Sequence, residues 1–266
     1  MRICAVCLFC CCLALAGRAI AQGEGGDSIE TDRDSFTPST STTSRGRAIV
    51  ESSYSFIDTR SVAETHSFPE LLVRCGLSDW LELRLGANYE VGGESSAVSG
   101  GGAIGFLDSG EIESETKLLY GLKAALANQS GWVPRSAVIL QGTTPASGPE
   151  TATHLTATYV WGWRLAEGWQ WDSAFRFATG SAEGDRFHRW APSTVLKYEF
   201  AEAWNAHVEY FGIFTDGRSE EISQSYLSPG VHYLITPDWE AGVRTGWGLG
   251  GDAANFFANV GVGYRY

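Results

Sequence analysis

Apolar and polar side chains alternate with a period of two residues along most of the chain, from Gly46 to the final Tyr266. In Leu81–Tyr89, for example, the odd positions are Leu, Leu, Leu, Ala and Tyr, whereas the even positions include Glu82 and Arg84. Successive side chains of a β-strand point to opposite faces of the sheet, so this pattern predicts strands with one apolar and one polar face. The same pattern recurs to the C-terminus and predicts an all-β fold.

The alternation divides into a series of predicted strands separated by two kinds of connection. Short connections such as 77–79 and 236–238 alternate with longer ones, notably the Gly-rich 92–112, then 180–186 and 215–223. Short turns at one end and long loops at the other are typical of a transmembrane antiparallel up-and-down β-barrel. The twelve predicted strands are 46–57, 66–76, 80–91, 113–127, 133–143, 151–165, 169–179, 187–200, 203–214, 224–235, 238–249 and 254–266.

The polar face carries both signs of charge, which distinguishes a barrel from a soluble β-sandwich. Opposite charges on neighbouring strands can pair inside a lumen, and pairing lowers the cost of confining them there. We expect the surplus acid to lie in the N-terminal segment and the loops, where water solvates it. The candidate lumen-lining residues are Glu51, Glu70, Arg74, Glu82, Arg84, Glu115, Lys117, Lys123, Arg135, Arg164, Asp172, Arg176, Lys197, Glu199, Glu209, Glu240, Arg244 and Arg265.

Tryptophan flanks every short connection. Tryptophan prefers the membrane interface, where its ring meets acyl chains and its N–H meets the headgroups. The alternative is that these residues are ordinary core tryptophans of a soluble sheet, but a core role would not confine them to one class of turn. The predicted interfacial girdle consists of Trp80, Trp132, Trp163, Trp169, Trp204 and Trp239.

The N-terminal residues 1–21 have the features of a secretory signal peptide. Arg2 precedes an apolar run, and Ala19 and Ala21 form a small-x-small cleavage motif before Gln22. A lipoprotein signal at Cys10–Cys12 is the less favoured alternative, since no small residues precede it. Residues 22–45 are then an irregular segment and a candidate plug, and 46–266 form the barrel.

Removal of the leader changes the charge and the cysteine content. Loss of Arg2 and Arg18 moves the formal net charge from −12 to −14, which argues against nucleic acid as a partner. Of the six cysteines only Cys75 remains, so the mature chain has no intramolecular disulfide and no cysteine-based zinc site.

No arrangement of residues predicts catalysis, a metal or a cofactor. By alternation, His154, His207 and His232 face the lumen from three different strands, and catalytic use would require them to converge with a carboxylate or a serine. Outer-membrane phospholipases place a serine and a histidine on the outer face, and the predicted outer faces here show no such pair. We therefore predict that the protein is not an enzyme.

The C-terminal strand ends on an aromatic residue. Tyr264 and Tyr266 close an alternating apolar pattern, which resembles the signal read by the barrel-assembly machinery of the outer membrane. Together with the leader and the tryptophans, this ending predicts a protein of the outer membrane of a Gram-negative-type bacterium, with outer-membrane lipid and the assembly machinery as partners.

Several motifs resemble a known family. Thr31-Asp-Arg-Asp-Ser-Phe-Thr37 is similar to the TDRPDFT opening of a family of outer-membrane transporters labelled "MetA-pathway of phenol degradation", although Asp34 stands where that family often has proline. Residues 66–74 and 80–84 resemble its second and third strands. Gly121, Lys123 and Pro134, followed by Ala137, Pro145 and Gly148, resemble its G-x-K…P…P-x-G stretch. The resemblance spans nearly all of the mature chain and implies an outer-membrane transporter-like barrel.

The sequence therefore favours a passive channel or transporter for small molecules, with hydrophobic or aromatic compounds as candidate solutes. A barrel of this size lies between the filled eight-stranded barrels and the open porins. Two alternatives remain open: a structural or adhesive barrel without transport, and, less favoured, a lipid hydrolase.

Overall fold

The computed structural model describes residues 28–59, 62–93, 98, 112–148, 151–182, 185–218 and 220–266. The predicted signal peptide lies outside the described residues, as does most of the 92–112 connection. Within the described part, no helix is long and apolar enough to cross a membrane. The strands are β1 (Ala48–Asp58), β2 (Thr65–Ser78), β3 (Leu81–Gly92), β4 (Ile112–Ala127), β5 (Arg135–Ser147), β6 (His154–Ala166), β7 (Trp169–Ala182), β8 (Asp185–Ala201), β9 (Trp204–Asp216), β10 (Ser223–Thr236), β11 (Trp239–Gly248) and β12 (Phe256–Arg265).

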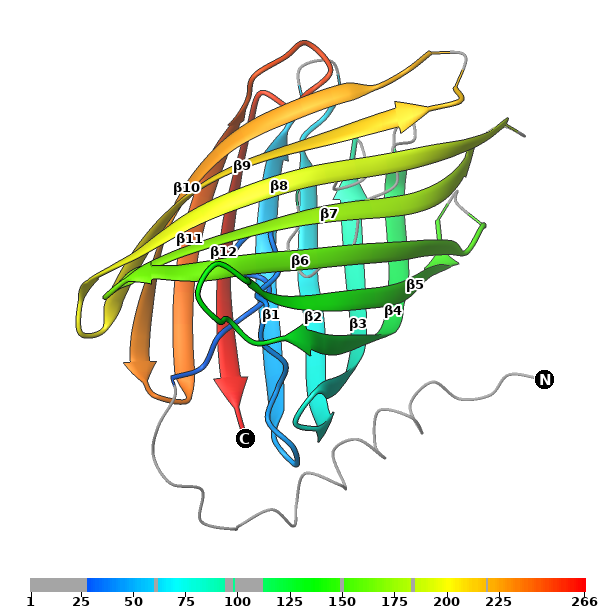
Figure 1. The fold of residues 1–266 in the computed structure, drawn as a ribbon. Coiled ribbons are helices and arrows are strands. Elements are labelled where there is room, and N and C mark those ends of the chain that lie inside the picture. Colours follow the sequence, from blue (N-terminus) through cyan, green and yellow to red (C-terminus); the bar gives the residue numbers. More distant parts are fainter. Residues whose placement is uncertain are drawn as a thin grey trace.

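Each strand pairs antiparallel with its neighbours in the chain, and β1 closes the sheet against β12 (Figure 1). In the closing ladder Val50 is opposite Tyr264, and the backbone N–H of Tyr266 donates to the carbonyl of Ala48 over 2.8 Å. Closure leaves no strand edge without a partner. The predicted all-β, antiparallel, twelve-stranded barrel is confirmed.

The strand boundaries follow the alternation to within a few residues, with one informative difference at β7 and β8. The sequence predicts a loop at 180–186, where glycine and acidic residues interrupt the apolar pattern. In the structure the ladder continues through Gly180 opposite Phe187 to Ala182 opposite Asp185. Ladder hydrogen bonds join backbone groups, so a hairpin can extend beyond the residues that face apolar surroundings.

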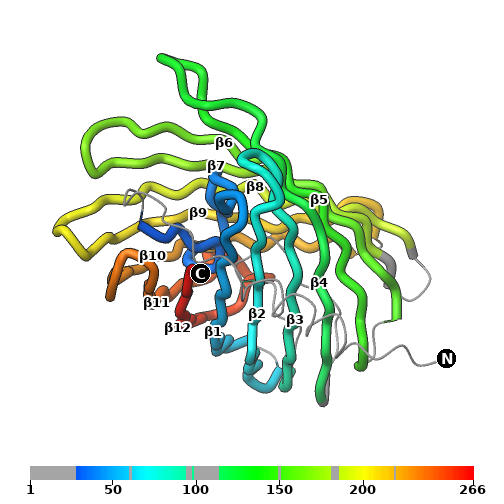
Figure 2. Tube along the Cα trace, turned by 90° about the horizontal axis from the view of Figure 1, so that it is seen from below, coloured from blue at the N-terminus to red at the C-terminus, as the bar shows by residue number. Residues whose placement is uncertain are grey.

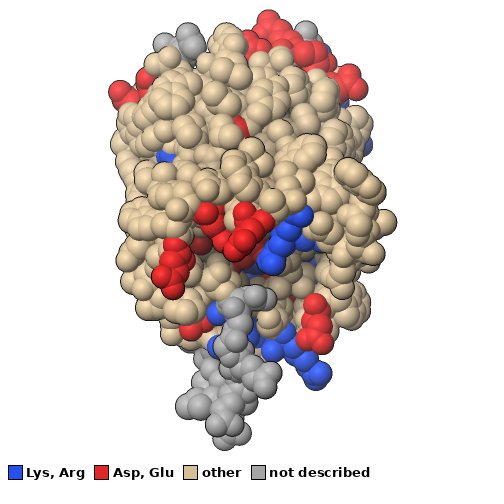
Figure 3. All heavy atoms as spheres, turned by 60° about the vertical axis from the view of Figure 1, so that its left-hand side comes forward, with Lys and Arg blue, Asp and Glu red and all other residues tan. Residues whose placement is uncertain are grey.

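The two faces of the sheet differ as the alternation predicts. On β4, Leu122 is 44% exposed and the next residue, Lys123, is completely buried. The outward face is rich in exposed Leu, Val, Phe, Tyr and Trp. Figure 3 shows a broad stretch of wall with few charged side chains, whereas acidic residues gather at the upper rim. The sheet is therefore apolar outside and polar inside, the reverse of a soluble barrel.

Aromatic pairs repeat at the end of the barrel that carries the connections 79–80, 128–134, 167–168, 202–203 and 237–238, here called the turn end. At each pair a tryptophan that begins a strand packs against a tyrosine directly opposite it in the ladder. The ring centroids are 4.3 Å apart for Trp169–Tyr198, 4.5 Å for Trp204–Tyr233 and 4.4 Å for Trp239–Tyr264.

The three remaining tryptophans of the predicted girdle lie at the same end. Trp80 is in the β2–β3 turn and Trp132 is in the β4–β5 connection, where it is almost fully exposed. The indole N–H of Trp163 donates to the carbonyl of Trp132 over 3.1 Å. All six therefore surround one rim of the barrel.

Residues 28–45, here called the interior segment, enter the barrel from the turn end and return to it. At the start, the N–H of Ile29 donates to the carbonyl of Pro237 over 2.8 Å, and at the end, the N–H of Gly46 donates to the carbonyl of Gly76 over 3.0 Å. Between these points the chain lies inside the ring of strands, as the blue trace shows in Figures 1 and 2.

Candidate functional site in the barrel interior

Glutamates of the barrel wall bind the backbone of the interior segment. Glu51 of β1 accepts hydrogen bonds from the N–H groups of Asp32 and Arg33, each over 2.8 Å. On the opposite side of the barrel, Glu209 of β9 accepts from the N–H groups of residues 36 and 37 over 2.8 and 2.6 Å. A buried N–H without an acceptor destabilises a fold, so these carboxylates replace the ladder partners that the segment lacks.

Two further wall glutamates bind the segment near its ends. Glu82 of β3 accepts from both the N–H and the hydroxyl of Thr43, over 2.7 and 2.9 Å. Glu240 of β11 accepts from the hydroxyl of Thr31 over 2.7 Å. Four strands distributed around the barrel thus hold the segment by its backbone and hydroxyl groups.

Cations of the wall bind the carboxylates of the segment. Asp32 is completely buried, and its carboxylate lies 2.5 Å from the guanidinium of Arg84, 3.2 Å from the Lys123 ammonium and 3.7 Å from the guanidinium of Arg74. It also accepts from the N–H and the hydroxyl of Ser39, over 3.0 and 2.6 Å. We call Arg74, Arg84 and Lys123 the cation cluster.

A second carboxylate of the segment is paired on the other side of the lumen. Asp34 lies 2.8 Å from the ammonium of Lys197 on β8. Burial alone would raise the pKa of Asp34, but the charge and hydrogen bond of Lys197, together with His232 and His207 nearby, lower the pKa to about 2. The group is therefore ionised at neutral pH and the pair is a charged one.

The wall also contains ion pairs of its own, as the sequence predicts. The ammonium of Lys117 lies 2.7 Å from Glu115, and the guanidinium of Arg135 lies 3.4 Å from Asp172. These pairs join residues on the same strand or on strands nearby.

The turn of the interior segment packs against an aromatic cluster. The ring of Phe36 stacks on Phe211 with centroids 4.2 Å apart, and the guanidinium of Arg176 lies over the other face of the Phe36 ring at 3.9 Å. Tyr226 and Phe257 extend the cluster across β10 and β12. All four aromatic side chains are buried, so this level of the lumen is apolar.

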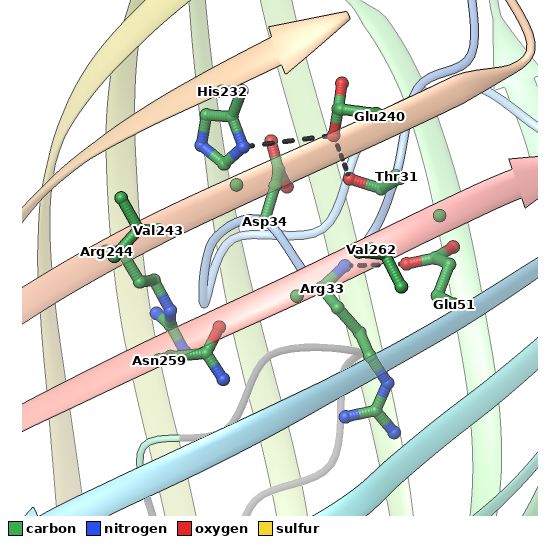
Figure 4. A pocket seen from close by; sticks show the side chains of 13 residues that line it. Thr31, Arg33, Asp34, Glu51, His232, Glu240, Val243, Arg244, Asn259 and Val262 are labelled. Carbon is green, nitrogen blue, oxygen red and sulfur yellow. Dashed lines mark hydrogen bonds and ion pairs between the residues drawn. The ribbon is translucent and has the colours of Figure 1, made fainter. Parts of the chain in front are cut away.

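A pocket remains between the segment and β11 and β12 (Figure 4). Inward-facing glycines of the two strands make room for it and for the segment. A Cβ at Gly263 would lie 2.4 Å from the Thr31 side chain, and one at Gly242 would lie 2.3 Å from the His232 ring. The polar side chains that line the pocket are Thr31, Arg33, Asp34, Glu51, His232, Glu240, Arg244 and Asn259.

Two of the three predicted lumen histidines meet beside this pocket. The Nδ1 atom of His207 lies 2.9 Å from the Nε2 atom of His232, whereas His154 contacts the carbonyl of Thr179 elsewhere in the barrel. Across the part of the chain that the structure describes, no group of three or more His, Cys, Asp or Glu side chains is arranged to hold a metal ion.

The structure places most of the predicted lumen-lining residues in the interior. Arg135, Lys197 and Arg265 are partly buried, and Arg164 and Glu199 are exposed at the turn end, outside the buried network. Arg265 pairs there with Asp238 over 2.8 Å. The fully buried members are Glu51, Glu70, Arg74, Glu82, Arg84, Glu115, Lys117, Lys123, Asp172, Arg176, Glu209, Glu240 and Arg244.

Sequence reasoning missed the role of the segment's own side chains. The expectation that acids of the N-terminal segment are solvated is wrong for Asp32 and Asp34, which are buried against wall cations. A signal was present, because Glu30, Asp32 and Asp34 alternate with the same period of two as the charged faces of the strands. The inward position of Phe211 and Phe257 also departs from the expected polar lumen.

Comparison with known proteins identifies relatives of the same architecture. A family model described as "Putative MetA-pathway of phenol degradation" matches residues 31–266. The COG4313 outer membrane channel from Pseudomonas putida F1 superposes with a TM-score of 0.60 and 12% identity, over 90% of this chain and all of that one. The NanC porin superposes with a TM-score of 0.54 and 11% identity, over 82% and 98% of the two chains. No curated protein sequence matches.

Proposed function

This chain belongs to the family described as "Putative MetA-pathway of phenol degradation", and we propose that it is an outer-membrane channel for small molecules whose interior segment closes the lumen. The observation that carries this proposal is the way the segment is held. It crosses the lumen on hydrogen bonds and ion pairs to side chains, whereas the wall is complete without it because β1 pairs directly with β12. A segment of this kind can leave without opening the barrel.

The outward face supports a position in the outer membrane. Lipid contacts a band of apolar side chains, and the rim of Trp–Tyr pairs lies at the headgroups of one leaflet. A closed ladder satisfies every backbone group of the wall, which is a condition for spanning a bilayer. Outer-membrane lipid is then the partner of the outer face, and the barrel-assembly machinery is the partner during insertion.

The apolar level of the lumen supports a hydrophobic or aromatic solute. Phe211, Tyr226 and Phe257 point inward, where a water-filled porin would have polar groups. Aromatic rings favour stacked or edge-on contacts with other rings. When Phe36 leaves Phe211, the position of its ring becomes a contact site for a solute.

A structural barrel without transport is the second candidate. The specific observation in its favour is that the interior is crossed by charged pairs of wall and segment, such as Asp32–Arg84 and Asp34–Lys197, which close the lumen in this state. The two functions differ in whether the segment ever moves.

Uptake by intact cells tests the proposal. Cells that express the chain should accumulate a radiolabelled aromatic hydrocarbon faster than cells with an empty vector. To separate a solute contact from the docking of Phe36, both substitutions are made in the variant that lacks residues 22–45. There Phe211→Ala should reduce uptake, while Phe200→Ala on the outward face, where Phe200 is half exposed, is the matched control and should not. Equal uptake by expressing and non-expressing cells, with the barrel present in the outer membrane, would favour the structural alternative.

A further inference from the structure

We propose that the cation cluster of Arg74, Arg84 and Lys123 is a binding site for the carboxylate group of a solute, and that Asp32 occupies it as an internal stand-in when the interior segment is in place. This inference rests on the proposed channel function and assigns a chemical class of solute to one level of the lumen.

The register of the strands concentrates positive charge at this point. Arg74 on β2 and Arg84 on β3 are direct cross-strand partners. Like charges directly opposite each other destabilise a sheet unless an anion lies between them. Lys123 on β4 is opposite Glu82, two residues along β3 from Arg84, and its ammonium contacts the same carboxylate oxygen of Asp32 as Arg84 does.

The wall supplies fewer anions than cations here. Among the ion pairs of the described residues, Glu82 contacts both arginines of the cluster, and Glu51 contacts Arg74 over 3.2 Å. The third carboxylate is that of Asp32, which belongs to the interior segment. Among these described ion pairs, three cations therefore meet two carboxylates of the wall, and the third carboxylate comes from the interior segment.

The geometry around Asp32 is that of a complete carboxylate site. Its Oδ2 atom lies 2.5 Å from Arg84, and the Lys123 ammonium lies 3.2 and 3.3 Å from Oδ2 and Oδ1. The site is fully buried, where charge-assisted hydrogen bonds are stronger than in water. Guanidinium groups match the planar shape of a carboxylate better than that of a spherical ion such as chloride.

The interior segment has attachments to the wall besides Asp32. Its backbone is already bound by Glu51, Glu82 and Glu209. When the segment withdraws, the cation cluster loses the carboxylate of Asp32, and removing one partner of a buried ion pair is costly. A solute that carries a carboxylate removes this cost and competes with the segment for the same position.

Binding of benzoate to the full-length chain in detergent tests the inference. The Asp32→Ala variant lacks the stand-in carboxylate. Equilibrium dialysis against radiolabelled benzoate in chloride buffer should therefore show that this variant binds benzoate about tenfold more tightly than wild type does. A tenfold ratio is what one charge-assisted contact supplies. Adding Arg84→Gln to Asp32→Ala should abolish the gain. Benzyl alcohol, a neutral molecule of similar shape, should bind all three proteins alike.

Asp34→Ala is the matched control, since it removes a carboxylate of the same segment that pairs with Lys197 and not with the cation cluster. Heat-modifiable migration on gels verifies that each variant is folded. Equal benzoate binding by Asp32→Ala and Asp34→Ala, or a gain that survives Arg84→Gln, overturns the inference. Dialysis requires no transport, so the two hypotheses can fail separately. A chain that binds benzoate but never conducts contradicts the channel function alone. A chain that conducts, but whose benzoate binding does not depend on Asp32 and Arg84, contradicts the carboxylate site alone.

Discussion

The ring of Phe36 stacks on the ring of Phe211, with centroids 4.2 Å and planes 10° apart. A residue that precedes the first strand is thereby packed against the ninth, on the far side of the barrel. The same ring lies under the guanidinium of Arg176, so it is held on both faces. This contact is the apolar counterpart of the ion pairs that hold the rest of the interior segment.

Replacing Phe36 by alanine should loosen the interior segment while the barrel stays folded. Loss of a buried phenylalanine side chain costs about 3–5 kcal/mol, and here the cost falls on the docked state of the segment. Limited trypsin digestion of the detergent-solubilised barrel should then cut after Arg33, which is only 9% exposed in the docked state. Phe200→Ala, on the outward face, serves as the control and should leave Arg33 protected. Equal protection of Arg33 in wild type and Phe36→Ala would show that the stacking does not hold the segment.

The strands, and the side chains that each strand turns inward, could be predicted from sequence because the cause is local. A one-residue slip in a strand such as 81–92 would turn Glu82 and Arg84 to the outside, so the alternation alone fixes which side chains face inward. The path of the interior segment could not be predicted in the same way. Asp32 pairs with Lys123 and Phe36 stacks on Phe211, and nothing near these residues in the sequence selects partners so distant.

The aromatic level of the lumen illustrates the same limit. Period-two reasoning assigns Phe257 to the polar face of its strand, and the structure does place it inward. It packs against Phe211 and Tyr226, and Phe36, which completes the cluster, comes from outside the sheet. The interior segment thus decides whether an inward aromatic ring is covered by another side chain or faces an open lumen. The alternation along the strands does not describe the path of that segment.

Epitope tags on intact cells test the orientation of the barrel. We predict that both termini are periplasmic and that the connections at 92–112, 180–186 and 215–223 face outward, because short turns of outer-membrane barrels are periplasmic. A tag between β7 and β8 should be labelled by antibody on intact cells, and a tag in the 128–132 turn should be labelled only after permeabilisation. The opposite pattern would invert the topology.

A charge on the outward face of β4 should destabilise the barrel by an amount that depends on how deep the substituted residue lies in the bilayer. Leu122→Arg, near the middle of the apolar band, should cost about 2–4 kcal/mol of unfolding free energy, and Leu126→Arg, next to the turn end, about 0–1 kcal/mol. Both side chains are exposed on this face, at 44% and 59%. Reversible denaturant unfolding in lipid vesicles measures the two costs. If they are equal, the band is not positioned across a bilayer as described.

Removing the C-terminal aromatic residue should impair insertion. Tyr266 donates its N–H to Ala48 in the closing ladder and packs edge-on against Tyr264, with ring centroids 4.5 Å apart. Tyr266→Lys should reduce the amount of heat-modifiable barrel in outer-membrane fractions while export to the periplasm continues, and Tyr266→Phe should restore it. An undiminished level of Tyr266→Lys barrel would argue against an assembly signal at this end.

Single-channel recording in planar bilayers tests whether the interior segment closes a channel, with the chain from residue 22 to 266 beside a variant that lacks residues 22–45. We predict little or no conductance for the longer chain and clear channel openings for the deletion. Removal of the segment exposes wall glutamates as well as Arg84, Lys123 and Lys197, but residues 22–45 carry five carboxylates against two arginines. Their loss makes the lumen more positive, so the openings should prefer anions. Arg84→Glu in the deletion variant should shift the preference toward cations. If the folded protein conducts neither with the segment nor without it, the chain is a closed structural barrel and the channel function is wrong.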